Sequence, residues 1–202
     1  MAAVLVGDTE RVAKVVDGVV EEGAKQLSPW VRPHVSGGVG TGGAPALWMA
    51  TWLGHVEGVR ELVGRGAEGG QVWRGMVALH MAAQLGRLDC VEAVVVGTPD
   101  VNVVREDDGA SAVWIAAAAG HAEVVGALIV GGCDPDVARR RDGTTPLYTA
   151  SMRGHAGVVR VLLGHGVDPI AATRSGGTAL SEAMARGHGV VVAMLRAAAS
   201  SV

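Results

Sequence analysis

Large aromatic side chains are scarce in this chain of 202 residues, which contains no phenylalanine and a single tyrosine, and only 3 % of its residues are aromatic. Hydrophobic residues nevertheless make up 49 %, with many alanines and valines, and 31 residues are glycine. The length is sufficient for a sizeable buried core. Since small side chains suit thin stacked layers, we expect an extended core rather than one large centre.

Cysteine and an excess of charge are also in short supply. Cys90 and Cys133 occupy different kinds of position, so we expect free thiols and no disulfide, as in the reducing cytoplasm or nucleus. The formal net charge of −3 gives no reason to expect nucleic acid or an anionic membrane as a partner.

Long apolar segments are nearly absent. Met1–Glu10 lacks the basic start and the apolar run of a signal peptide. The one long apolar run, 112–132, contains His121, Glu123 and several glycines. We therefore expect no membrane-spanning helix.

The chain does contain a helical hairpin pattern, which is clearest in 142–168. Thr145 can cap a first helix through its hydroxyl. Leu147 and Ala150 then share one face, and Gly154 allows the left-handed conformation that ends a helix. A second helix is predicted from a second apolar set, which comprises Val158, Val159, Leu162 and Leu163.

This hairpin recurs along the chain. Its Gly-His pair is found, with one Gly-Arg variant, at Gly54–His55, Gly86–Arg87, Gly120–His121, Gly154–His155 and Gly187–His188. The glycines are 32, 34, 34 and 33 residues apart, and a period near 33 indicates a solenoid. Glycines within the predicted second helices, each costing about 0.5–1 kcal/mol relative to alanine, are Gly58, Gly126, Gly157 and Gly189.

Three strings in these units closely resemble the ankyrin repeat. They are Thr-Pro-Leu-Tyr-Thr-Ala at 145–150, Ala-Leu-His-Met-Ala-Ala at 78–83 and Gly-His-Ala-Gly-Val-Val-Arg-Val-Leu-Leu at 154–163. The resemblance covers roughly residues 40–202 and depends on five copies in register. It implies an all-α solenoid of stacked helix-turn-helix units joined by β-turn or hairpin loops.

The resemblance also divides the chain. A degenerate N-terminal capping repeat is predicted at 1–24, followed by an inserted loop rich in proline and glycine at 25–39. The five repeats are then expected at 40–71, 72–105, 106–139, 140–172 and 173–202.

The sequence patterns that could indicate a catalytic site or a cofactor site are incomplete. Gly38, Gly40 and Gly43 fit a dinucleotide-binding string, but no strand pattern precedes them. The recurring histidines are spread along the solenoid, too far apart for one metal ion, and the resemblance implies that they bond neighbouring backbone. No Ser-His-Asp spacing or nucleophile elbow is present. We therefore expect no enzyme and no cofactor.

The function that is left after these exclusions is recognition of another protein or peptide. We therefore predict a non-catalytic interaction scaffold. The resemblance implies that partners meet the concave side, formed by the loop tips and the exposed face of each first helix. Transferred to this sequence, the predicted contact residues are Trp52, Leu53, Trp73, Arg74, Met76 and Leu85, then Asp107 and Asp108, then Arg141, Arg153, Arg174 and Arg186.

Several alternatives stay open. The loop 25–39 could cover the tryptophans, and the arginines could bind an acidic segment or simply form a solvated rim. The apolar helix containing 190–195 lacks the polar outer face of an end cap, which would suit a targeting or inhibitory module cut from a larger enzyme or signalling protein. We expect a monomer, with association through this helix as the alternative.

Overall fold

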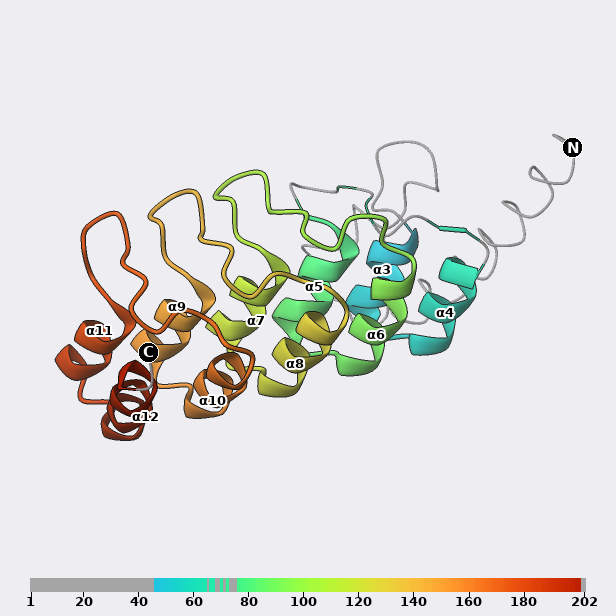
Figure 1. The fold of residues 1–202 in the computed structure, drawn as a ribbon. Helices are drawn as coiled ribbons and strands as arrows, with labels where there is room; N and C mark the ends of the chain where they lie inside the picture. Colours follow the sequence, from blue (N-terminus) through green and yellow to red (C-terminus); the bar gives the residue numbers. More distant parts are fainter. Residues whose placement is uncertain (1–45, 65, 68–69, 71, 73–75, 201–202) are drawn as a thin grey trace, which may run out of the picture.

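The computed structural model describes residues 46–64, 66–67, 70, 72 and 76–200. The predicted capping repeat 1–24 and inserted loop 25–39, together with Trp73 and Arg74, lie outside the described residues. The described part of the chain contains ten helices, and isolated β-bridges join Val104 to Ser111 and Ala172 to Thr178. The predicted all-α solenoid is therefore confirmed (Figure 1).

The helices form five pairs in two parallel rows (Figure 1). Each first helix contacts the second helix of its own pair and the first helices of adjacent pairs, and the second helices stack in the same way. The first-helix row consists of α3 (Ala46–Leu53), α5 (Ala78–Leu85), α7 (Ala112–Ala119), α9 (Pro146–Arg153) and α11 (Ala179–Ala185). The second-helix row consists of α4 (Val56–Gly64), α6 (Leu88–Val96), α8 (Ala122–Val130), α10 (Ala156–Gly164) and α12 (Gly189–Ala199).

The predicted helix ends are seen in α9. Thr145 Oγ1 accepts a hydrogen bond from Tyr148 N at 3.1 Å. Ser111 caps α7 in the same way. At the other end of α9, Gly154 has φ +75°, a left-handed conformation that glycine adopts without strain. Sequence patterns thus locate the start of α7 and both ends of α9.

The core is one continuous layer between the two rows. The buried residues of the first helices are alanines mixed with larger side chains such as Leu79 and Leu147, and at least one aliphatic side chain of each second helix is buried against the neighbouring pairs. At one equivalent position of the second helices the buried residues are Leu62, Val94, Leu128, Leu162 and Leu195. A single hairpin could not bury its apolar side alone, so the stack depends on contacts between neighbours.

The recurring histidines link each pair to the one before it. His121, His155 and His188 place Nε2 at 3.3, 3.3 and 3.1 Å from the backbone carbonyls of Gln84, Ala118 and Met152. Their bonding to neighbouring backbone, which the ankyrin resemblance implies, is confirmed.

Candidate partner-binding face

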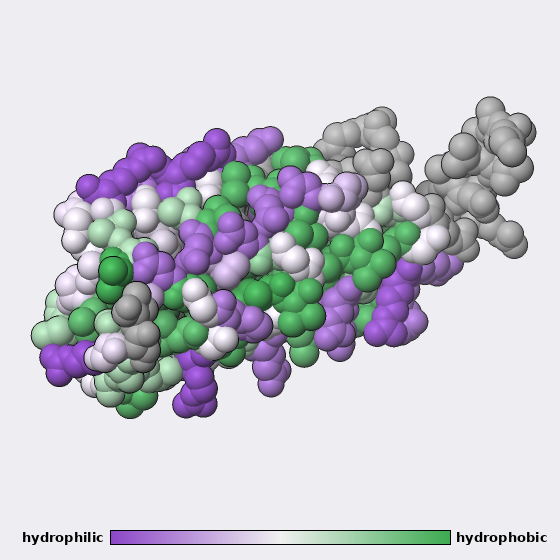
Figure 2. Space-filling view, viewed as in Figure 1, coloured by the Kyte–Doolittle hydropathy of each residue, from purple (hydrophilic) through white to green (hydrophobic). Residues whose placement is uncertain are grey.

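Three loops project beside the first helices and form, with them, the face that we call the concave face (Figure 1). These loops comprise 105–110 before α7, 139–144 before α9 and 173–177 before α11. Figure 2 shows hydrophilic residues gathered along the projecting loops and apolar surface over the helices. On the first helices of the concave face, Leu85 is exposed and Trp52 and Met152 are half-buried, so this face combines polar loop tips with a partly apolar wall.

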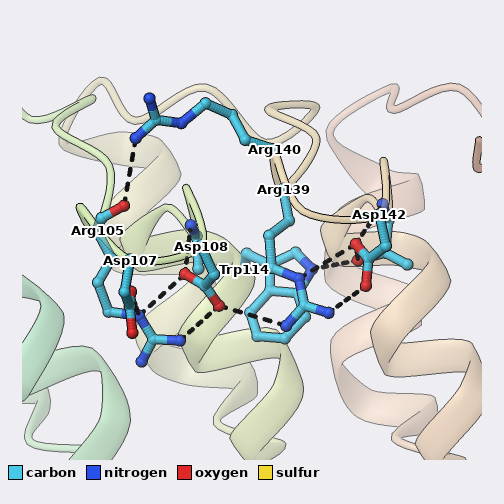
Figure 3. A network of polar contacts seen from close by, with 9 residues as sticks. Arg105, Asp107, Asp108, Trp114, Arg139, Arg140 and Asp142 are labelled. Atoms are coloured by element: carbon cyan, nitrogen blue, oxygen red, sulfur yellow. Dashed lines mark hydrogen bonds and ion pairs between the residues drawn. The ribbon is translucent and has the colours of Figure 1, made fainter.

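An ion-pair network connects the first two loops (Figure 3). Arg105 donates to Asp108 through Nε at 3.0 Å and Nη2 at 2.6 Å. Arg139 comes from the next loop, and its Nη1 lies 3.4 Å from Asp108 Oδ2. The same guanidinium donates through Nε to Asp142 Oδ1 at 3.2 Å, and through Nη2 to Asp142 Oδ2. Arg139 thus bridges two carboxylates on successive loops.

The same arginine covers an aromatic ring. Its guanidinium carbon lies 4.2 Å from the centroid of the Trp114 ring, a cation–π geometry. The indole Nε1 donates to Thr144 Oγ1 at 3.1 Å, and the Thr144 hydroxyl donates to Asp142 Oδ1 at 2.7 Å. We call this contact the α7–α9 joint. A single arginine side chain fills it.

The two carboxylates differ in exposure. The Asp108 side chain is 7 % exposed and that of Asp142 is 37 % exposed. Hydrogen bonds from Arg105 lower the pKa of Asp108 to about 2. Hydrogen bonds from Arg139 likewise lower the pKa of Asp142. Both groups are therefore ionised at neutral pH, but only Asp142 retains an accessible edge.

A cavity of about 300 Å³ opens beside Asp142, between α9 and the loop before α11. We call this contact the α9–α11 joint. Trp114 and Arg139 of the filled joint form one wall of the cavity. The residues that line the rest of it include Asp142, Tyr148, Met152, Arg153, Thr173 and Ser175.

Tyr148 lies at the helix position that Trp114 occupies one repeat earlier. Its hydroxyl donates to Glu182 Oε2 at 3.4 Å. Burial, and then the nearby Glu182 carboxylate, raise the pKa of Tyr148. The ring is only half-buried. The cavity therefore presents an aromatic surface beside a carboxylate.

The predicted contact residues of the first two repeats have mixed positions. Trp52, Leu53 and Met76 are half-buried, while Leu85 at the end of α5 is 41 % exposed. Trp48, one helical turn before Trp52, belongs to the buried residues. This end of the concave face thus offers a modest apolar surface among the described residues.

The predicted acidic pair divides. Asp107 is exposed and contacts Arg105 at 2.9 Å. Asp108 is buried, because the guanidinium groups of Arg105 and Arg139 enclose its carboxylate and Ala110 N donates to it at 3.0 Å. Asp108 is therefore a residue of the loop framework and not a surface contact.

Of the five predicted arginines, the four within the described residues are all exposed, and one of these four lines the cavity. That residue, Arg153, donates from Nη1 to Ala118 O at 2.8 Å. Arg186 is paired with Glu182 at 2.6 Å on α11. Arg141 and Arg174 lie on the second and third loops, where their backbone N–H groups bond the preceding loop. The structure brings only Arg153 to the cavity.

The predicted set lacks three residues that shape this part of the face, Trp114, Arg139 and Tyr148. Their signal is present in the periodicity, because Arg105, Arg139 and Thr173 follow one another at intervals of 34 residues. The last member of that series replaces an arginine with a threonine. A comparison of the loops position by position would have located the cavity.

No group of three or more potential metal-ligating side chains comes together among the described residues. Within those residues, no helix is both long and apolar enough to cross a membrane. Both cysteines are free and buried.

The paired helices, the projecting loops and the exposed wall beside them define a helical repeat protein of the solenoid class. The family model described as ankyrin repeats (3 copies) matches residues 47–139 and 113–201. The chain belongs to the ankyrin repeat family. Ankyrin repeats are generally protein–protein interaction modules, and the family is typically non-catalytic. A comparison with curated proteins found no significant match.

Proposed function

We propose that this chain is a non-catalytic scaffold that binds another protein or peptide on the concave face. The supporting observation is a contrast between two sets of equivalent positions. The buried position of the second helices is Leu or Val in all five pairs. The equivalent position at the concave ends of the first helices varies freely, as Trp52, Gln84, Ala118, Met152 and Ala185.

This contrast separates scaffold from recognition surface. A uniform buried position preserves the stack, whereas the first-helix position varies in size, polarity and exposure from repeat to repeat. Exposed apolar and arginine side chains are also common in protein interfaces. The predicted contact residues on this face, from Trp52 to Arg186, remain our proposed interface, with Asp108 supporting it from within.

A pair of matched double variants tests the proposal. Leu85→Glu with Arg153→Glu alters the concave face, while Val96→Glu with Arg160→Glu alters exposed residues on the second helices of the same two pairs. The amount of each partner that the unmodified protein captures should fall at least tenfold with the first variant and stay unchanged with the second. Circular dichroism must show both variants folded. Equal loss in both, or retention in both, contradicts a concave interface.

A second candidate is a targeting or inhibitory module joined to a larger enzyme or signalling protein. Met184 on α11 is 52 % exposed, whereas its equivalents Thr51, Ala83, Ala117 and Ser151 are fully buried by the next helix pair. Val190 on α12 is 66 % exposed. Apolar surface at this end of the described stack favours a covering partner.

Light scattering of the purified chain distinguishes these cases. We expect a monomer if the surface is covered by a different protein, and twice that mass if it is covered by a second copy. Met184→Glu should abolish either association. If this variant changes neither the mass nor the set of captured proteins, the second candidate is wrong.

We also propose the capping repeat at 1–24, the loop at 25–39 and the five repeat boundaries given above. Brief trypsin treatment should cut first at Lys25 and leave a stable fragment that starts at residue 26, because the bond after Arg32 precedes a proline and resists trypsin. An intracellular location, cytoplasmic or nuclear, is our proposal on the basis of two unpaired thiols. Burial raises the pKa of Cys133 to about 11, so this thiol is protected from oxidation.

A further inference from the structure

The α7–α9 joint provides a template for the cavity at the α9–α11 joint. In the filled joint, a guanidinium lies over the ring of Trp114 and contacts Asp108 of the preceding loop. The ring and the carboxylate recur one repeat later as Tyr148 and Asp142. What fills the first joint is the side chain of Arg139.

The next loop offers no such side chain. Arg139 N donates to Thr144 O, and Thr173 N donates to Gly177 O, which closes a hairpin that is one residue shorter. Thr173 therefore occupies the backbone position of an arginine, and Gly177 occupies that of Thr144. A methyl carbon placed on Gly177 would lie 3.5 Å from the Tyr148 hydroxyl, so the missing side chain leaves that ring uncovered. The cavity is the space that the absent arginine would fill.

The Asp142 carboxylate accepts hydrogen bonds from Arg139 and Thr144, but among the described residues it has no second cation as a partner. Asp108 Oδ2 accepts one hydrogen bond from Arg105 of its own loop and another from Arg139 of the following loop. Asp142 Oδ2 accepts a hydrogen bond from Arg139 of its own loop. Among the described residues, no cationic side chain of the following loop donates to it. This difference accounts for the greater exposure of Asp142.

We propose that the cavity at the α9–α11 joint is a subsite for an arginine side chain supplied by the partner. The guanidinium lies over Tyr148 and donates to Asp142 Oδ2, as Arg139 does with Trp114 and Asp108. The inference rests on the proposed function of the concave face. Arginine is preferred to lysine because its planar group both stacks on a ring and donates along a carboxylate edge.

The charged residues that line the cavity are Asp142, Arg139 and Arg153. Asp142 supplies the acceptor for a guanidinium, and Arg139 is already paired with Asp108 and Asp142. Although Arg153 lines the cavity, it already donates to a backbone carbonyl. An acidic side chain is nevertheless the clear competing ligand, because Arg153 and the nearby loop carry positive charge.

The test uses three small probes, N-acetyl-arginine amide, N-acetyl-lysine amide and N-acetyl-glutamate amide. Each is titrated into the full chain while backbone amide signals of Tyr148, Thr173 and Gly177 are followed by NMR. We expect saturable shifts with the arginine probe at millimolar concentration, as is usual for one side chain. The lysine probe should bind at least threefold more weakly, and the glutamate probe should leave these signals unchanged.

A matched pair of variants supplies the missing arginine. Thr173→Arg should fill the cavity, abolish binding of the arginine probe and raise the melting temperature. Ala172→Arg adds the same charge one residue away, at an exposed position outside the cavity lining, and should leave probe binding unchanged. Asp142→Asn should weaken probe binding at least tenfold.

Two results would overturn the subsite: equal shifts with all three probes, or probe binding that survives Thr173→Arg. Preferential binding of the glutamate probe would replace it with an anion subsite. The concave interface is tested separately by Leu85→Glu alone, because Leu85 lies outside the cavity lining whereas Arg153 belongs to it. If partners are lost there but the arginine probe does not bind, the scaffold stands and the subsite fails; the reverse result retains the subsite and rejects the scaffold.

Discussion

The α7–α9 and α9–α11 joints have similar backbones and different contents. At the first, Arg139 spans two loops, covers Trp114 and encloses Asp108. At the second, Thr173, Ser175 and Gly177 replace larger or charged residues, and a cavity of about 300 Å³ remains. In a solenoid, a binding cavity can thus arise where one repeat omits a side chain that its neighbour carries. Stability and recognition are alternative uses of the same position.

The largest expected effect comes from emptying the filled joint. Arg139→Met keeps the length of the side chain but removes the charge that Asp108 and Asp142 share. We expect a loss of about 2–4 kcal/mol in the free energy of unfolding, because a mostly buried carboxylate loses a partner and Trp114 loses its cation. Urea denaturation measures this loss.

The neighbouring arginine provides the control for this variant. Arg140 is exposed and donates only to Arg105 O at 3.5 Å. Arg140→Met should change the stability by no more than about 0.5 kcal/mol. If both variants lower the free energy of unfolding equally, the bridging arginine does not stabilise the α7–α9 joint. The contrast drawn between the two joints would then be wrong.

A somewhat smaller effect, with a defined pH window, is expected at Asp108. Its pKa is lowered from 3.8 to about 2 in the folded chain, so the folded state favours the ionised form. The stability that this provides is present above about pH 4 and is lost as the pH falls toward 2. The shift corresponds to about 2 kcal/mol.

Asp108→Asn tests this linkage. The variant should be about 2 kcal/mol less stable than the unmodified protein at pH 7, and the difference should shrink below pH 4. Urea denaturation at a series of pH values gives the difference directly, so protonation of other groups cancels. A gap that stays constant down to pH 2.5 would show that the ionisation of Asp108 contributes nothing to folding.

The sequence predicts the helices of this fold well because their signals are local. The caps at Thr145 and Ser111 and the left-handed Gly154 are each confirmed, since they depend on a few neighbouring residues. The pattern is less informative at helix starts: Gly189 is the first residue of α12 and not an interior one, so its cost to the helix is smaller than predicted.

The candidate site is less predictable because it depends on how side chains of different loops meet. Periodicity places Asp108 at a variable loop tip, yet two arginines, one 31 residues away, enclose it. The hairpin of the third loop is also one residue shorter, from Thr173 to Gly177, so a fixed offset misaligns its polar residues. The register of the repeats predicts which residues lie on the concave face, whereas the geometry of the loops determines which of them line the cavity.

The smallest expected effects concern the second-helix row, at the contact between α8 and α10. Gly126 in α8 and Gly157 in α10 have ordinary helical backbone, and an added methyl would lie 3.8 Å from Val161 Cγ1 and 3.5 Å from Ala122 Cβ, respectively. Gly126→Ala and Gly157→Ala should therefore each stabilise the chain by about 0.5–1 kcal/mol. Thermal unfolding measures both.

Gly58 in α4 is the contrasting position for this last prediction. A methyl there would lie 2.7 Å from His55 Nδ1, which accepts the Gly58 N–H at 2.9 Å. Gly58→Ala should therefore bring no gain, because the imidazole must move. Both added methyls at Gly126 and Gly157 would lie between α8 and α10, so the two gains should be similar. A gain that is missing at either position would show that this contact has no room for a methyl group, as at Gly58.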